Sequence, residues 1–240
     1  INVNTHPYIT TGMSDNKFGI DQSDILSLYK DASVLDGISI TGIDFHIGSQ
    51  IMELEPYLES LAKIITIADD LDASGIPLKH IDIGGGLGIP YKGEPIVDKN
   101  IYISEIIKII GDRKLSLVIE PGRSIVGEAG LLITKIINIK ESSTKSFAIT
   151  DAGMNDMLRP PLYEAFHSII EVVDKSIGKT SYDVVGPICE TADFLGKDRK
   201  LSIAQGDFLA VENVGAYGFV LSSNYNTCLL YTSDAADDVR

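Results

Sequence analysis

The glycine-rich segment from Ile81 to Gly88 has the composition of a phosphate-binding turn. Three consecutive glycines, Gly84, Gly85 and Gly86, come directly after a short apolar run. Because glycines have no side chain, their backbone N–H groups can approach and cradle an anionic group such as a phosphate. A tight turn between a strand and a helix has the same composition without any ligand, so spacing alone leaves both interpretations open.

A carboxylate and a guanidinium follow the next apolar run, in the sequence Glu120-Pro121-Gly122-Arg123. Placed three residues apart at the end of a strand, they suit a ligand that carries one cationic and one anionic group. An ordinary surface ion pair between Glu120 and Arg123 is the alternative, since such pairs are frequent and weak.

A histidine and a serine, His46 and Ser49, follow an earlier apolar run. A lone histidine in this position is more often packed in a core than functional. However, the His46 segment, the glycine turn and Glu120–Arg123 each follow a different strand, and parallel strands bring their carboxyl ends to one edge of a sheet. We therefore expect the three segments to lie over one crevice.

Short apolar runs alternate with longer amphipathic ones from Ile1 to about Val126, a pattern that predicts four parallel βα units. The expected strands cover residues 1–4, 38–45, 80–83 and 115–120, and the expected helices cover 21–32, 56–74 and 103–110. A (β/α)8 TIM barrel needs eight strands. The fold class is therefore α/β, with a partial barrel that corresponds to about the second half of a complete one.

After Gly127, short strands separated by Gly, Ser, Asp and Lys turns predict a mostly β C-terminal domain. Its expected strands cover residues 131–139, 146–150, 169–173, 183–185 and 208–211, and residues 154–167 are expected to form a polar loop that runs into a short helix.

Composition excludes several classes of function. The chain of 240 residues has a net charge of −14, which disfavours nucleic acid as a partner. No apolar run reaches the roughly 18 residues of a membrane span. The two cysteines are too few for a disulfide framework or a metal cage, and the four histidines show no metal-binding spacing. We expect a cytoplasmic protein with no metal, no membrane and no nucleic acid.

Taken together and in order, the motifs resemble the diaminopimelate decarboxylases, fold-type III pyridoxal-phosphate enzymes with an alanine-racemase-like barrel. The resemblance runs from Ile1 to about Asn226. It is carried by Thr5-His6-Pro7-Tyr8, Asn16-Lys17-Phe18-Gly19-Ile20, Phe45-His46-Ile47-Gly48-Ser49-Gln50, the Gly84 turn, Glu120-Pro121-Gly122-Arg123, Asp151-Ala152-Gly153-Met154-Asn155, Arg159-Pro160-Pro161-Leu162-Tyr163-Glu164-Ala165, Gly186-Pro187-Ile188-Cys189-Glu190 and Gly215-Ala216-Tyr217.

The resemblance implies a site for pyridoxal 5'-phosphate. His46 would stack on the pyridine ring, and Glu120 would bind the ring nitrogen and keep it protonated, so that the ring withdraws electrons. Ser49 and the glycine turn would hold the phosphate. The residues that complete the cofactor and substrate pocket would be Pro121, Gly122, Arg123 and Tyr217.

The implied reaction is the decarboxylation of meso-2,6-diaminopimelate to L-lysine and CO2, in a homodimer with shared active sites. Arg123 and Arg159 would bind anionic groups, and Glu190 would face the substrate ammonium. Tyr163 would add a hydroxyl group, and Tyr217 would complete the substrate pocket. Arg159 favours a diacid over ornithine, which has no distal carboxylate, although a surface position for Arg159 and Tyr163 stays open.

By the same resemblance, Cys189 would protonate the carbanion from the partner subunit. Without the resemblance, a buried structural thiol is the simpler interpretation of Cys189. A decarboxylase for another basic amino acid and a non-catalytic barrel that binds pyridoxal phosphate are the remaining alternatives.

Two features depart from the family pattern. The family uses a Schiff-base lysine on an early barrel strand, and no lysine of this sequence has that context. We therefore expect an N-terminally truncated, inactive fragment whose half barrel exposes an apolar sheet edge. Residues 227–240 do not follow the family pattern, and Cys228 has no assigned role. The predicted division is thus a partial barrel (1–126), a β domain (127–226) and an unrelated tail (227–240).

Overall fold

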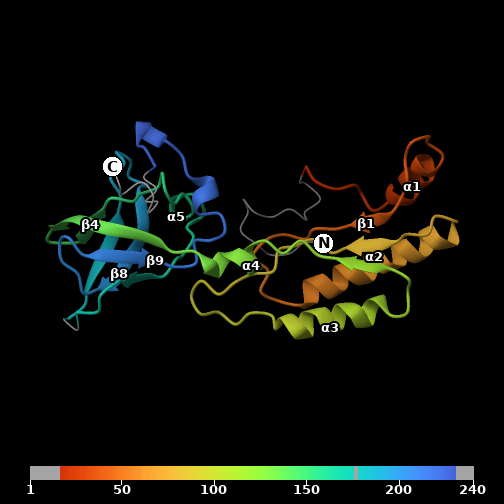
Figure 1. Cartoon of the computed structure of the whole chain (residues 1–240), viewed down its shortest axis with the longest axis horizontal. Coiled ribbons are helices and arrows are strands. Elements are labelled where there is room, and N and C mark those ends of the chain that lie inside the picture. The colour runs from red at the N-terminus through yellow and green to blue at the C-terminus, as the bar shows by residue number, and fades with distance from the viewer. Residues whose placement is uncertain (1–16, 176–177, 231–240) are drawn as a thin grey trace, which may run out of the picture. The chain divides into compact units, whose positions relative to one another are not determined.

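The computed structural model describes residues 17–175 and 178–230 (Figure 1). The chain divides into two compact units. The first contains Ile1–Pro90 and Glu94–Ile125, and the second contains Tyr91–Gly93 and Val126–Arg240. The expected strand at residues 1–4, the motif Thr5-His6-Pro7-Tyr8, and positions 231–240 of the expected tail lie outside the described residues.

The first unit is a three-stranded parallel sheet with helices between its strands. The elements in chain order are α1 (Ile25–Ser33), β1 (Gly42–Asp44), α2 (Glu55–Ala73), β2 (His80–Asp82), α3 (Lys99–Ile110), β3 (Ser116–Val118) and α4 (Arg123–Val126). The strand order is β1-β2-β3, with Ile43 beside Ile81 and Ile81 beside Leu117. This is the βα arrangement of a partial barrel.

The long helix α2 forms because its apolar residues repeat at helical spacing and it has clear end signals. Pro56 stands in its first turn, where a missing N–H does no harm. Its buried side chains, Leu61, Ile65 and Leu71 among them, form the core of this unit with Ile81 and Ile106. Gly75, at φ +81°, ends the helix.

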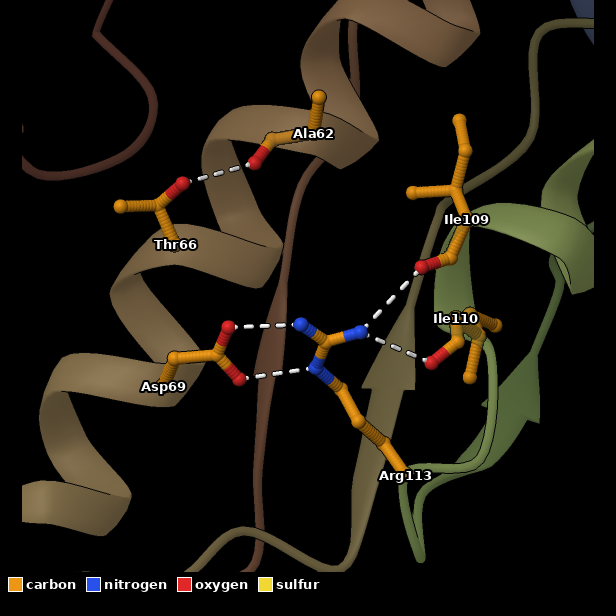
Figure 2. Close-up of polar contacts among 6 residues, drawn as sticks. All are labelled: Ala62, Thr66, Asp69, Ile109, Ile110 and Arg113. Carbon is orange, nitrogen blue, oxygen red and sulfur yellow. Dashed lines mark hydrogen bonds and ion pairs between the residues drawn. The ribbon is translucent and has the colours of Figure 1, made fainter.

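Helix α3 is fixed at both ends by polar contacts. The Asp98 carboxylate accepts the N–H groups of Asn100 and Ile101, a cap that moves the helix start to Lys99, four residues before the expected one. Figure 2 shows the other end, where the Arg113 guanidinium pairs with Asp69 of α2 at 2.7 and 2.8 Å. It also donates to the last carbonyls of α3, those of Ile109 and Ile110.

Several expected boundaries of this unit were wrong. The first helix begins at Ile25 rather than at residue 21, because the Asp21 carboxylate accepts hydrogen bonds from Ser23 outside the helix. Strands β1 and β3 have three residues each, shorter than expected, since the chain on both sides of them is irregular.

The second unit is a six-stranded sheet with short helical turns. The strands are β4 (Leu132–Glu141), β5 (Ser146–Thr150), β6 (Ile169–Glu171), β7 (Thr180–Val185), β8 (Phe194–Leu201) and β9 (Phe208–Val211), in the order β6-β9-β4-β5-β7-β8. Helix α5 (Arg159–Tyr163) lies between β5 and β6, and the turns are η1 (Gly127–Ala129), η2 (Phe219–Leu221) and η3 (Tyr225–Thr227). The core includes Ile136, Ala148, Val184, Leu195 and Leu209.

Strand β8 was absent from the sequence prediction. Its centre, Gly196 to Lys200, is rich in charged residues and resembles a turn, but it pairs with β7 across two register shifts. A mostly β unit therefore follows the partial α/β barrel. Within the described residues, none of the helices is both long and apolar enough to span a membrane.

Candidate functional site

Three loops meet at the carboxyl edge of the parallel sheet. Beyond the strands the backbone pairing continues, with Phe45 N–H donating to Asp82 O, Ile83 N–H to Val118 O and Glu120 N–H to Gly84 O at 2.9 Å. The loops after β1, β2 and β3 are therefore tied to one another. The expected convergence of the His46 segment, the glycine turn and Glu120–Arg123 is confirmed.

The glycine turn is pressed between its two neighbouring loops. A Cβ atom on Gly85 would lie 2.2 Å from Glu120 O, and one on Gly86 would lie 2.1 Å from Gly48 O. Gly84 and Gly86 also have positive φ angles of +66° and +91°. The close backbone approach thus requires glycine at all three positions, whatever the turn binds.

Hydrogen bonds with three side chains, those of His46, Asp82 and Tyr57, fix the orientation of the glycine turn. The Gly85 N–H donates to His46 Nδ1 at 3.3 Å, and the Gly84 N–H donates to an Asp82 carboxylate oxygen at 2.9 Å. On the buried side the Tyr57 hydroxyl donates to Gly85 O at 3.0 Å, and burial raises the pKa of Tyr57 well above its ordinary value. His46 itself is exposed, so it is not a packed core histidine.

A hydrogen bond between Arg123 and Ser49 joins the loops that follow β1 and β3. Arg123 begins α4 and is only 7% exposed, and its Nη2 donates to Ser49 Oγ at 3.2 Å. The two residues are 74 positions apart in the chain. The guanidinium therefore provides fixed positive charge beside a hydroxyl, a combination that suits an anionic group.

Carboxylates also lie at this edge of the sheet, where Asp44 ends β1. Burial is the main cause that raises the pKa of Asp44, and the charges of Asp82 and Glu120 raise it further, while His46 lowers it. Glu120 is exposed.

A pocket of about 160 Å³ opens beside the glycine turn. Its lining is mainly apolar and consists of Gly84, Gly85, Leu87, Lys99, Tyr102, Ile103, Ile119, Pro121, Ser124 and Ile125. Lys99 and the loop of Glu120–Arg123 thus border one hollow with the turn.

The remaining expected site residues belong to the second unit. Arg159 begins α5 and is 6% exposed, and its Nη1 contacts His167 Nε2 at 2.7 Å and Tyr91 OH at 2.9 Å. Tyr163, at the end of α5, is half-buried. Tyr217 is 44% exposed and has a left-handed backbone with φ +59°.

Cys189 and Glu190 lie on an exposed loop that a buried carboxylate holds in place. Asp193 is 4% exposed, and its two oxygens accept the N–H groups of Met154 and Ile188, each at 2.6 Å. Burial raises the pKa of Asp193, and these two N–H groups partly oppose the shift. Sequence reasoning did not find Asp193, His167, Tyr91 or Tyr57, because nothing in their spacing marks them as partners of site residues.

The donor set of the first unit fits pyridoxal phosphate. An exposed imidazole, a carboxylate, a hydroxyl, a guanidinium and a glycine turn lie on one edge, which is what a flat ring with a protonated nitrogen and a phosphate requires. In the described part of the chain, no group of three His, Cys, Asp or Glu residues is placed to hold a metal ion.

Comparisons with known proteins agree with this chemistry. The chain is 47% identical over 226 residues to diaminopimelate decarboxylase of Neisseria meningitidis and 48% identical over 227 residues to that of Pseudomonas aeruginosa. These alignments cover 94% and 95% of this chain but 56% and 55% of the relatives, so the chain spans about half of their length.

Solved structures give the same result. Diaminopimelate decarboxylase of Helicobacter pylori complexed with L-lysine superposes with a TM-score of 0.89 at 42% identity, covering 93% of this chain and 56% of that one. The M. jannaschii enzyme with L-lysine gives a TM-score of 0.87 at 39% identity, covering 95% and 55%. Residues 1–127 match the family model of the pyridoxal-dependent decarboxylases, pyridoxal binding domain. The chain therefore belongs to the pyridoxal-dependent decarboxylase family.

Proposed function

We propose that this chain is part of a decarboxylase that converts meso-2,6-diaminopimelate to L-lysine and CO2 with pyridoxal 5'-phosphate. The observation that carries the proposal is the convergence of His46, Gly84–Gly86 and Glu120–Arg123 at one sheet edge, linked by the contacts of Gly85 with His46 and of Glu120 with Gly84. The identity of 45–48% to several diaminopimelate decarboxylases supports the substrate.

The candidate site residues of the first unit each have a part in holding the cofactor. The His46 imidazole would pack on the ring, and Ser49, the glycine turn and Gly122 with Arg123 would receive the phosphate. The Glu120 carboxylate would accept the hydrogen bond of the ring nitrogen and hold the proton there. Pyridoxal phosphate, when bound, supplies an electron-withdrawing ring that stabilises the carbanion left by the loss of CO2.

The second unit supplies groups that suit a substrate with an amino acid at both ends. The guanidinium of Arg159 binds the carboxylate of the non-reacting end, and Glu190 faces the ammonium of that end. Tyr163 and Tyr217 add hydroxyl contacts. The exposed Cys189 thiol is a proton donor to the reacting carbon, contributed across a homodimer. We place this reaction in the cytoplasm, since the substrate and product are metabolites and the chain has only two cysteines.

Glu120→Gln tests the cofactor site. The amide keeps the shape of the side chain but removes its charge, and the lost charge-assisted hydrogen bond of about 1.5–3 kcal/mol predicts a fall in the rate of CO2 release by about 10- to 100-fold. Glu59→Gln, a matched change at an exposed position of α2, should leave the rate unchanged. The assay uses the whole encoded protein of which this chain is a part, with added pyridoxal phosphate.

The same assay with ornithine, arginine and lysine as substrates separates the alternatives. Faster release of CO2 from one of these than from meso-diaminopimelate would replace the proposed substrate. Tight binding of pyridoxal phosphate without turnover of any of the four would instead indicate a non-catalytic binding protein.

A further inference from the structure

His167 is the most deeply buried polar residue around the candidate substrate-binding group Arg159. Its side chain is 0% exposed, and it stands two residues before β6. The Glu212 N–H donates to Ser168 O at 2.9 Å, which continues the ladder between β6 and β9 and brings Glu212 O to the imidazole. The sheet thus fixes where the ring lies.

The partners of the imidazole determine its tautomer. Nδ1 lies 2.9 Å from Glu212 O, and a carbonyl oxygen only accepts hydrogen bonds, so Nδ1 carries a proton. Nε2 lies 2.7 Å from Arg159 Nη1, and a guanidinium nitrogen only donates, so Nε2 is the acceptor. The ring is therefore the neutral Nδ1–H tautomer. The imidazolium would turn an N–H toward the guanidinium and abolish this bond.

Two further contacts from Tyr91 fix the plane of the guanidinium. Arg159 Nη1 donates to the Tyr91 hydroxyl at 2.9 Å, and Arg159 Cζ lies 4.8 Å from the centre of the Tyr91 ring. The Tyr91 and His167 rings pack edge to face, with centroids 5.0 Å apart. Both N–H bonds of Nη1 thus point at protein acceptors. The opposite edge of the guanidinium, with Nε and Nη2, has the two parallel N–H bonds that a carboxylate accepts side-on.

We infer that His167, as the neutral Nδ1–H tautomer, is a positioning residue that holds the Arg159 guanidinium in one orientation for a carboxylate ligand. The orientation itself follows from the contacts of His167 and Tyr91. That the ligand is the carboxylate of an α-amino acid end rests on the proposed function. A locked guanidinium loses less rotational freedom when the carboxylate binds, which is the advantage of the arrangement.

The first test examines the orientation without any ligand. In ¹⁵N NMR spectra of the chain at neutral pH, the ring nitrogens of His167 should have the shifts of a protonated Nδ1 and an unprotonated Nε2. The Nη nitrogens of Arg159 should give separate signals, because rotation about their bonds to Cζ is blocked. A protonated Nε2, or averaged Nη signals in the unmodified chain, would overturn the inference.

Two variants separate the two hydrogen bonds of the ring. In His167→Gln the side-chain carbonyl replaces Nε2 as the acceptor for Arg159, whereas in His167→Asn the amide replaces the Nδ1–H donor and leaves Arg159 without that acceptor. We expect separate Arg159 signals in His167→Gln and averaged ones in His167→Asn. His80→Gln, a matched change on β2 in the first unit, should leave the Arg159 signals as they are. Separate signals in His167→Gln and His167→Asn alike would overturn the inference, because the surrounding fold, not the acceptor, would then set the orientation.

The last test uses L-lysine and cadaverine, which differ by one carboxylate. With pyridoxal phosphate present, His167→Asn should weaken the binding of L-lysine by about tenfold or more and that of cadaverine by less than about twofold. An equal loss for both ligands would refute the role toward a carboxylate. This binding test uses the whole encoded protein of which the chain is a part. If that protein without substitutions binds neither ligand while the NMR results hold, the proposed function fails and the positioning by His167 stands.

Discussion

Replacing Gly85 by alanine should loosen the whole candidate cofactor site. The new methyl group would lie 2.2 Å from the carbonyl oxygen of Glu120, an approach that real Cβ atoms do not tolerate. Neither partner of this contact can move easily. The Gly85 backbone is held by hydrogen bonds with Tyr57 and His46, and the Glu120 N–H is bonded to Gly84 O. The strain must therefore be relieved by separating the loops after β2 and β3.

The size of the effect follows from this contact. An ordinary carbon–oxygen contact needs about 1 Å more than the space available, and overpacking of this kind costs about 1–3 kcal/mol. If the strain is released by breaking the hydrogen bond from Glu120 N–H to Gly84 O, the exchange of that amide should accelerate by about 5- to 100-fold.

Amide hydrogen exchange followed by NMR measures this directly. The comparison variant is Gly122→Ala in the neighbouring loop, where a Cβ would meet nothing within 4 Å, and we expect unchanged exchange of the Glu120 amide there. Equal protection of this amide in Gly85→Ala and the unmodified chain would refute the argument, because the added methyl group would then be accommodated without separating the two loops.

Three further substitutions test the supports of the first unit. Tyr57→Phe leaves the Gly85 carbonyl without its buried donor and should lower the free energy of unfolding by about 1–2 kcal/mol in urea titrations; no change would mean that water replaces the hydroxyl. Asp98→Ala removes the cap of α3 and should cost about 1 kcal/mol by the same measurement, whereas Asp98→Asn should keep most of it. Asp69→Asn tests pH dependence: because Arg113 holds the pKa of Asp69 below its ordinary 3.8, the pair stabilises the fold fully above that pH and the contribution disappears as the pH falls through the lower folded value. Both side chains are exposed, so the free energy of unfolding of the unmodified chain should exceed that of Asp69→Asn by at most about 0.5 kcal/mol above pH 4. This difference should vanish in acid, and a difference that grows in acid would contradict the predicted direction of the pH dependence.

The parallel part of the fold could be predicted because its signals are local. The helical spacing of α2, with a proline at its start and a glycine after its end, placed that helix within one residue at each end. Strands β5 and β9 have the predicted bounds. Strand β8 could not be predicted, because Lys197, Asp198 and Arg199 have the composition of a turn. Arg199 pairs with Tyr182 of β7, and Lys197 and Asp198 lie at an irregularity of that pairing, which leaves no pattern in the sequence.

The part of the candidate site that directly follows the strands was predictable for the same reason. His46, the glycine turn and Glu120–Arg123 each follow a strand directly, and the rule that parallel strands end at one edge was enough to bring them together. The loop contacts beneath them depend on residues far apart in sequence. Ser49 and Arg123, for example, are 74 positions apart, and only the folded chain brings them together.

Each group of candidate ligand-binding residues has one buried polar side chain that contacts it from within. Tyr57 lies under the glycine turn, Asp193 holds the backbone before Cys189, and His167 holds Arg159; all three are at most 4% exposed. A buried polar group that loses its partner costs more than the hydrogen bond itself contributes. These contacts therefore resist distortion more than contacts between exposed groups would, and they hold the glycine turn, the Cys189 loop and Arg159 in fixed positions. Substitution of Tyr57, Asp193 or His167 should therefore disturb ligand binding more than the distance of that residue from the ligand suggests. In each unit, the buried core thus helps to position the residues that bind the ligand.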